Sequence, residues 1–335
     1  MLIESIRLQN FRCHADSKFI FDKATFIEGE NGSGKTSVVE AVYLLLNLKS
    51  FKEPSPKSVT SFGADFLRIE ASYSSADDSG GLIYFFEDAR TLKKNGVCVL
   101  DIPEYLASSP VFCFSPDTST ILAKDQKVRR NYIDRLCFYR ERAHIFDLRY
   151  YNRLISQKTA ELQKQRPDKN YIDTVNEKII EMCSKISLRR KAATDMINSR
   201  LQLMYNDFGG SDEFFTLDYV TNSGNLDVLN KEASATRCLY GIHRDRFYSR
   251  NTGRIYDKFS SYGQKKTFEL LVLSAILLDV EEMLKTDIIT LLDDFEAGLD
   301  EKRSAAFFSI FSGERQVIMT GVKNRIFTDI RTIGL

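Results

Sequence analysis

The stretch Gly29–Thr36, which reads GENGSGKT, decides the fold. It follows a short apolar run at 24–28 and leads into a run of helix-forming residues that begins at Thr36. Between a strand and a helix, glycines at this spacing let backbone N–H groups point at a phosphate, the lysine reaches the β and γ phosphates, and the hydroxyl ligates Mg²⁺. The stretch predicts a phosphate-binding loop formed by Gly29, Glu30, Asn31, Gly32, Ser33, Gly34, Lys35 and Thr36.

A phosphate loop of this type requires an aspartate at the end of a neighbouring strand to hold Mg²⁺. Asp293 closes the apolar run 288–292 and fits this role, with Thr36 as the other metal ligand. The adjacent Asp294 could orient the attacking water, and Glu296 is a competing candidate base. The predicted catalytic residues are Lys35, Asp293 and Asp294.

The remaining pattern predicts an α/β protein. Alternating apolar residues indicate strands at 2–9, 67–73 and 82–86, with a shorter one at 98–100. Towards the other end, the pattern predicts helices at 267–285 and 302–311 and buried strands at 288–294 and 316–321. We expect the phosphate-loop lobe and this terminal lobe to share one sheet.

Charge separates the middle of the chain from the rest. The formal net charge is only +1, yet Lys124–Lys169 contains thirteen Lys or Arg against six Asp or Glu. The segments 141–165 and 171 onward read as a helical hairpin, with apolar residues in a heptad seam that Arg189 interrupts. A basic helical face is often only solvated, but it can also follow a DNA backbone. The candidate DNA-binding residues are Lys127, Arg129, Arg130, Arg135, Arg140 and Arg142.

Several classes of protein are disfavoured by the composition. The six cysteines are scattered without a CxxC pair, which fits neither a disulfide framework nor a zinc site. The N-terminus alternates like a strand and lacks the apolar core of a signal peptide. No apolar run approaches the roughly 20 residues of a membrane helix. We therefore expect a soluble, cytoplasmic protein without a membrane partner.

A second small polar turn, SSYGQKKT at 260–267, opens the helix expected at 267–285. In ABC-type ATPases a loop of this kind faces the γ-phosphate held by the partner subunit of a head-to-tail dimer. Ser261, Gly263 and Gln264 resemble the last positions of that signature, with Tyr262 in place of its middle glycine. The alternative is an ordinary Ser–Gly helix cap.

The chain as a whole resembles the RecF family of SMC-like ABC ATPases. The resemblance rests on IRLQNFRCH, the phosphate loop, SVTSFGADFLRIEASY, FSPDTSTILAKDQKVRRNYIDRL, YGIHRDRF, FSSYGQKKTFELLVL and LLDDFEAGLD, which occur in collinear order. It implies an α/β ATPase head formed by 1–115 and 236–335. The segment 116–235 would be an inserted, mainly helical arm with a short coiled-coil hairpin.

The resemblance also implies a function. RecF-like proteins bind ATP and Mg²⁺, dimerise on duplex DNA near single-strand gaps, and act with RecO and RecR to load RecA in recombinational repair, linked to DNA replication and the SOS response. Arg12 would lie near the nucleotide, and Ser115 and Asp117 near the Q-loop. His243, Arg244 and Asp245 match the HRD segment of the family.

Two departures suggest slow ATP turnover. The family usually ends the LLDD stretch with Ser-Glu-Leu-Asp, where this chain has Ala297, Gly298, Leu299 and Asp300. The last strand is followed by Thr320 where ABC transporters have a histidine. The alternatives are a nucleotide-locked DNA scaffold with negligible ATPase activity, an ABC-type subunit of a transporter or another system, and an ATP-gated nuclease.

Overall fold

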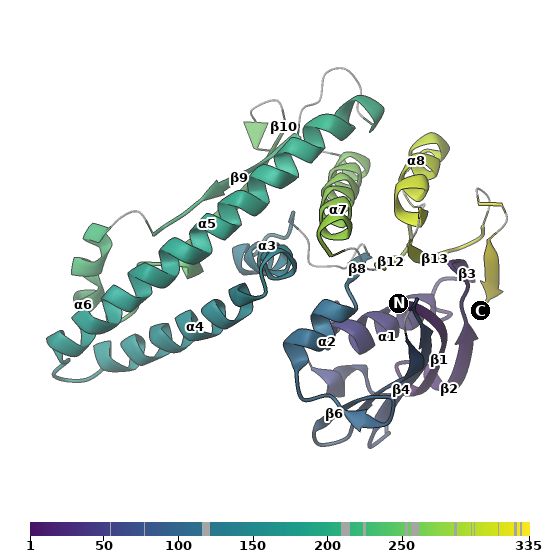
Figure 1. The fold of residues 1–335 in the computed structure, drawn as a ribbon, viewed down its shortest axis with the longest axis horizontal. Helices are drawn as coiled ribbons and strands as arrows, with labels where there is room; N and C mark the ends of the chain where they lie inside the picture. Colours follow the sequence, from purple (N-terminus) through teal and green to yellow (C-terminus); the bar gives the residue numbers. More distant parts are fainter. Residues whose placement is uncertain are drawn as a thin grey trace. The chain divides into compact units, whose positions relative to one another are not determined.

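The computed structural model describes residues 1–335 apart from 54, 77, 116–120, 209–214, 224–225, 252–253, 256–260, 285–286, 296, 298, 314, 325–326 and 329. The chain divides into two compact units (Figure 1): Met1–Thr118 with Leu277–Leu335 form unit 1, and Ser119–Ile276 form unit 2. The predicted boundaries at 115/116 and 235/236 stay a prediction. Asp117, Ser260, Glu296 and Gly298 lie outside the described residues.

A five-stranded parallel sheet forms the centre of unit 1. Its strands lie in the order β14 (Arg331–Gly334), β3 (Ala24–Glu28), β13 (Gln316–Gly321), β12 (Ile289–Leu292) and β8 (Val111–Phe114). Strands from both ends of the chain pair in it, which confirms the expected shared sheet. All carboxyl ends meet at one edge, so the residues after β3, β12 and β13 are brought together there.

A six-stranded antiparallel sheet covers α1 (Lys35–Asn47) on its other side, in the order β2 (His14–Ile20), β1 (Leu2–Phe11), β4 (Leu67–Ser74), β5 (Ser79–Phe86), β6 (Arg90–Lys94) and β7 (Val97–Cys98). β4 alternates buried and half-buried residues, as a sheet with one core face requires. α1 is buried from Val38 to Leu46. Unit 1 also contains the short turn η1 (Pro56–Val59), α2 (Ile102–Ser108) and α8 (Glu301–Ser312).

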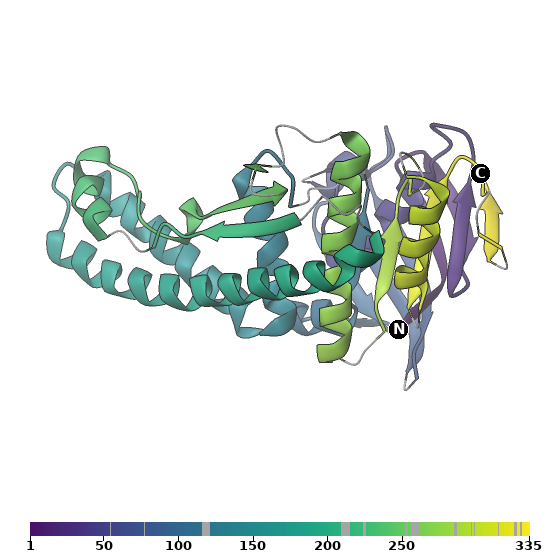
Figure 2. The same ribbon diagram turned by 90° about the horizontal axis from the view of Figure 1, so that it is seen from above.

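Helices dominate unit 2. α3 (Gln126–Arg140) is followed by α4 (Ala143–Leu162) and α5 (Lys169–Phe208), which pack against each other as the predicted hairpin. Figures 1 and 2 show α5 along its full length, with β9 (Phe215–Val220) beside it. The other elements are η2 (Leu226–Lys231), α6 (Glu232–Ala235), η3 (Ile242–Arg244), β10 (Arg246–Asn251), β11 (Arg254–Ile255) and the first part of α7 (Tyr262–Leu284). None of the described helices combines the length and the apolar character that crossing a bilayer requires.

The apolar seam of α5 departs from the predicted heptad after Ile186. Arg190 takes the next buried position with 2 % of its surface exposed, and Ala193 and Ile197 follow it. The neighbouring Arg189, which was expected in the seam, lies at its edge with a side chain 17 % exposed. The shift arises because a straight α-helix has 3.6 residues per turn and drifts away from a strict seven-residue repeat.

Candidate functional site

The loop Gly29–Thr36 connects β3 to α1 at the carboxyl edge of the parallel sheet. Lys35 begins α1, and its Nζ donates hydrogen bonds to the carbonyl oxygens of Gly29 at 2.8 Å and Glu30 at 2.7 Å. Gly34 has φ = 102°, and a Cβ there would lie 2.7 Å from Cys13 Sγ. Only glycine satisfies both conditions. The loop is thereby folded around the lysine.

Asp293 directly follows β12 and is 2 % exposed. Three hydroxyl groups donate hydrogen bonds to its carboxylate: Thr36 to Oδ1 at 2.9 Å, Thr320 to Oδ1 at 2.7 Å and Ser115 to Oδ2 at 2.8 Å. Thr36 lies at the start of α1 after β3, Thr320 lies near the end of β13, and Ser115 follows β8, so the strand order of the sheet is what brings them together. A buried carboxylate requires such partners, because burial of a charge without hydrogen bonds is costly.

Asp294 is held in a special backbone conformation. Its φ is 46°, which is uncommon for a residue other than glycine, and its N–H donates to Thr320 Oγ1 at 3.0 Å. The Thr320 hydroxyl therefore accepts from one aspartate and donates to the other. Sequence reasoning noted Thr320 only as a missing histidine and did not predict that it would join the two carboxylate residues.

The residues of this site fit a nucleotide with Mg²⁺. Thr36 and Asp293 present the hard oxygen atoms that Mg²⁺ prefers, and their side chains already lie within hydrogen-bond distance. Among the described residues no cluster of three or more His, Cys, Asp or Glu could hold a metal by itself. Ser33 Oγ is buried in the loop and has no hydrogen-bond partner among the described residues. A phosphate oxygen would satisfy it.

The comparison with protein families agrees with this geometry: the model of the AAA ATPase domain matches residues 1–315. The chain belongs to this family. Among curated proteins, it is similar to the DNA replication and repair protein RecF of Staphylococcus epidermidis, with 25 % identity over 96 % of this chain and 93 % of the relative. RecF of Leptospira biflexa is 27 % identical over 96 % of this chain and 91 % of the relative.

Solved structures show the same fold. The recombination mediator RecF-ATPrS of the RecFOR pathway has a TM-score of 0.86 at 21 % identity, covering 100 % of this chain and 96 % of that one. An SMC head bound to the winged-helix domain of ScpA has a TM-score of 0.56 at 16 % identity, covering 97 % and 90 %. The expected SMC-like ATPase head with a helical insertion is therefore confirmed as a fold.

Arg12, which the resemblance assigns to the nucleotide, has a contact within this AAA ATPase chain. Its Nε and Nη2 donate to the two carboxylate oxygens of Glu40 on α1 at 2.9 and 2.8 Å. Hydrogen bonding to Glu40, which is 1 % exposed, raises the pKa of Arg12 above its ordinary value. Arg12 thus holds α1, the helix that follows the phosphate loop, through Glu40. The contact of Arg12 with a nucleotide stays a prediction.

The signature-like turn forms a reciprocal helix cap. The Ser261 N–H donates to Gln264 Oε1 at 2.9 Å, and the Gln264 N–H donates to Ser261 Oγ at 3.3 Å. This is a capping box at the start of α7, and the sequence S-x-x-Q contains its signal. Gly263 lies in the first turn, and Tyr262 is 59 % exposed. The cap explains Ser261 and Gln264 within one chain, and a role in a partner's site stays a prediction.

The predicted DNA-binding residues on and beside α3 fall into three groups by their exposure. Arg129 is 3 % exposed and donates to the carbonyl oxygens of Ala123 at 2.6 Å and Phe247 at 2.9 Å. The prediction that Arg129 binds DNA is therefore wrong. Its guanidinium is buried and joins α3 to the backbone at Ala123 and Phe247 of the same chain. Lys127 and Arg142 are exposed, whereas Arg130, Arg135 and Arg140 are half-buried.

Arg130 and Arg135 also have partners inside unit 2. Arg130 donates to the backbone oxygen of Asp245 at 2.8 Å, and burial lowers its pKa. Arg135 lies over the ring of Tyr139, 5.8 Å from its centroid. These contacts give both arginines a place in the packing of unit 2.

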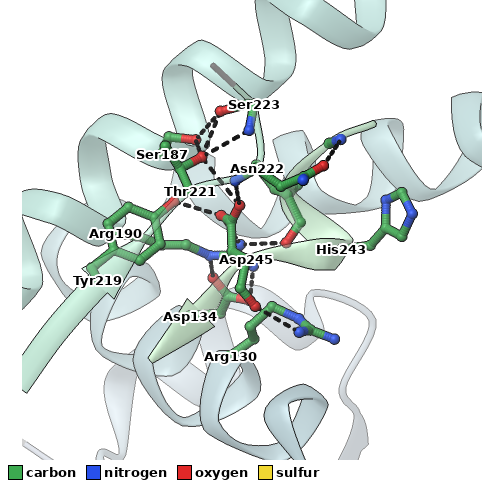
Figure 3. A network of polar contacts seen from close by, with 12 residues as sticks. Arg130, Asp134, Ser187, Arg190, Tyr219, Thr221, Asn222, Ser223, His243 and Asp245 are labelled. Atoms are coloured by element: carbon green, nitrogen blue, oxygen red, sulfur yellow. Dashed lines mark hydrogen bonds and ion pairs between the residues drawn. The ribbon is translucent and has the colours of Figure 1, made fainter. Parts of the chain in front are cut away.

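The HRD segment supports the fold of unit 2 (Figure 3). Asp245 is fully buried and accepts a hydrogen bond from Arg190 at 2.8 Å. Arg190 also makes a bidentate contact with Asp134, with both distances 2.8 Å, so it bridges the buried carboxylate of Asp245 and the mostly buried carboxylate of Asp134. His243 Nδ1 lies 2.6 Å from the Tyr151 hydroxyl, and burial lowers the pKa of this histidine. The sequence had given no sign that Arg190 was the centre of this network.

Proposed function

We propose that this protein is an ATP-dependent DNA-binding protein of recombinational repair, which dimerises on duplex DNA when ATP is bound and reopens after slow hydrolysis. The observation that carries the proposal is the Asp293 carboxylate, which receives hydrogen bonds from Thr36 of the phosphate loop and from Thr320 and Ser115. The nearly full-length similarity to proteins named DNA replication and repair protein RecF supports the role in repair.

The chain's own residues divide the work at the nucleotide. Lys35 exchanges its two carbonyl contacts for β- and γ-phosphate oxygens, and the loop N–H groups hold the same phosphates. Thr36 and Asp293 hold Mg²⁺, which neutralises developing charge on the phosphates when bound. Asp294 orients the attacking water and accepts its proton. Ser261 and Gly263 of a second copy complete the site from outside.

Thr320 positions both aspartates in this scheme, which gives a testable substitution. Thr320→Val keeps the shape but removes the acceptor of the Asp294 N–H and one of the two hydroxyl donors to Asp293 Oδ1. A buried group without its partner costs about 1–3 kcal/mol, so we expect ATP turnover to fall by about tenfold or more. ATP affinity should stay within a factor of about two, because Lys35 and the loop are unchanged.

The matched control is Thr320→Ser, which retains the hydroxyl and should retain most of the turnover. The measurement is the steady-state ATPase rate of the three proteins beside their ATP affinity from equilibrium titration. Wild-type turnover in Thr320→Val would contradict the positioning role.

The proposed dimerisation is tested by sedimentation. ATP should raise the dimer fraction relative to ADP, because only ATP supplies the γ-phosphate that the second copy's Ser261 and Gly263 would contact. The measurement is the mass in analytical ultracentrifugation at equal protein concentration with each nucleotide. Equal masses with ATP and ADP would remove the role assigned to Ser261 and Gly263.

A nucleotide-locked DNA scaffold is the second candidate function. Ala297 and Gly298 stand where the family has Ser and Glu, so the serine hydroxyl and the glutamate carboxylate are missing. Asp300 caps α8 by accepting from the Arg303 N–H at 2.8 Å, which is a role within the chain. In a scaffold, ATP would still close the dimer, but the ATPase rate would be negligible with and without duplex DNA.

A further inference from the structure

One face of α4 joins exposed aromatic side chains with arginines. Phe146 is 53 % exposed and Tyr150 is 40 % exposed, and Arg149 and Arg153 are exposed beside them. At 100° per residue, these four side chains lie within about 100° of the helix circumference. We call them the α4 face. Phe146 and Tyr150 are four residues apart, so their two exposed rings form a pair on the same side of the helix.

The opposite face of α4 packs inside unit 2. Tyr151 and Leu154 are buried in the core cluster that α4 shares with α5, along which α4 lies in Figure 1. That packing fixes the direction of the α4 face, because residues at i+3 and i+4 share a side of a helix. The face is thus presented on a rigid element and not on a loop.

The charge of the α4 face is not compensated. α4 contains only two carboxylates, and both are engaged: Asp147 pairs with Arg189, and Glu161 with Lys164. Neither Arg149 nor Arg153 pairs with a carboxylate anywhere in the described parts of the chain. A surface with two unpaired arginines and no free acid favours a polyanion as its occupant.

The exposed aromatic rings indicate whether this polyanion is a duplex or a single strand. A duplex presents its phosphates but hides the faces of its bases, whereas unpaired bases stack on exposed aromatic side chains, and arginines beside them hold the backbone. The four residues cover about 11 Å along the helix, which is the length of a few nucleotides. We propose that the α4 face binds single-stranded DNA by stacking bases on Phe146 and Tyr150, with Arg149 and Arg153 on the phosphates.

This inference rests on the proposed function, since it adds a contact for the single strand at a gap to the binding of duplex DNA. Binding of the single strand differs from binding of duplex DNA in whether it requires ATP. Because the α4 face belongs to unit 2 and shares no residue with the nucleotide site of unit 1, single-strand binding at this face should not depend on ATP. The two proposals can therefore fail separately.

The experiment measures binding of a fluorescein-labelled 20-nucleotide oligothymidine to the full chain by anisotropy, without nucleotide and over a series of salt concentrations. The double variant Phe146→Ala/Tyr150→Ala should weaken binding by about tenfold or more with an unchanged salt slope. Arg149→Ala/Arg153→Ala should lower the slope of log K against log salt by about 1.4, because each phosphate contact contributes about 0.7.

Controls separate this result from general damage to unit 2. Leu188→Ala/Leu203→Ala removes exposed apolar side chains from α5, and Lys178→Ala/Arg237→Ala removes two exposed cations elsewhere in unit 2. Both should bind the oligothymidine like wild type. A 20-base-pair duplex should bind the aromatic double variant as tightly as it binds wild type.

Either of two outcomes would overturn the proposal. One is wild-type oligothymidine binding in both α4 double variants, which would assign the α4 face to a protein partner. The other is an equal loss of single-strand and duplex binding in the aromatic variant. Failure of the proposed function appears elsewhere, as duplex binding that does not respond to ATP.

Discussion

Lys35→Ala is expected to abolish the ATP-dependent retention of duplex DNA. Lys35 is the cation at the centre of the phosphate loop, held there by the Gly29 and Glu30 carbonyls. A hydrogen bond to a charged group is worth about 1.5–3 kcal/mol, so ATP affinity should fall by about 10- to 100-fold. Without bound ATP the second copy has no γ-phosphate to contact, and the dimer should not close on DNA.

The matched control for this variant is Lys18→Ala, since Lys18 is an exposed lysine on β2 of the same unit. It should retain duplex DNA like wild type. The measurement is the fraction of labelled duplex retained in the presence of ATP at fixed salt. Retention at the wild-type level in Lys35→Ala would contradict the proposal that bound ATP closes the dimer on duplex DNA.

Arg190→Met is expected to destabilise unit 2 by about 3–5 kcal/mol, because it leaves Asp134 and Asp245 buried without their shared cation. The effect should appear in hydrogen exchange of the α5 amides in the full chain, which assigns the loss to unit 2. The control is the adjacent Arg189→Met. Arg189 pairs with Glu141 and Asp147 near the surface, so the loss there should be about 1 kcal/mol or less.

The cost of Arg190→Met should depend on pH. Burial by itself would raise the pKa of Asp134, but the charge of Arg190 and hydrogen bonds from His144 and Arg190 bring it below its ordinary value. A carboxylate whose pKa is lowered in the folded state stabilises the protein above the ordinary Asp pKa of about 3.9. This stabilisation is lost as the pH falls through the lowered pKa. The difference between wild type and Arg190→Met should therefore shrink as the pH falls below about 4. A difference that is constant with pH would count against an ionic origin.

The phosphate loop and the acidic strand end were predictable because their signals are local. GENGSGKT lies between an apolar run and a helix-forming run, and Asp293 ends an apolar run of its own. The chemistry of each is contained in fewer than ten consecutive residues. Their meeting at one sheet edge followed from the general rule that parallel strands bring their carboxyl ends together.

Contacts that depend on strand order and helix rotation were not predictable in this way. Thr320 reaches Asp293 only because β13 lies next to β12, and the Arg12 pair with Glu40 requires β1 to lie over α1. Arg190 enters the core through the drift of α5 away from its heptad.

The error at Arg129 was avoidable, because its position already contained a signal. Ile133, Leu136 and Cys137 follow at i+4, i+7 and i+8, which places Arg129 on the buried face of α3. Charge alone had suggested a surface residue. A cation in line with an apolar stripe is better interpreted as a buried structural arginine.

The most direct test of the central claim is the affinity of the wild-type protein for a labelled duplex with ATP, with ADP and without nucleotide, all at one salt concentration. The same titration provides the reference for Lys35→Ala. The account predicts tighter binding with ATP than with ADP, and equal binding with ADP and without nucleotide. Equal affinity in all three conditions would contradict it.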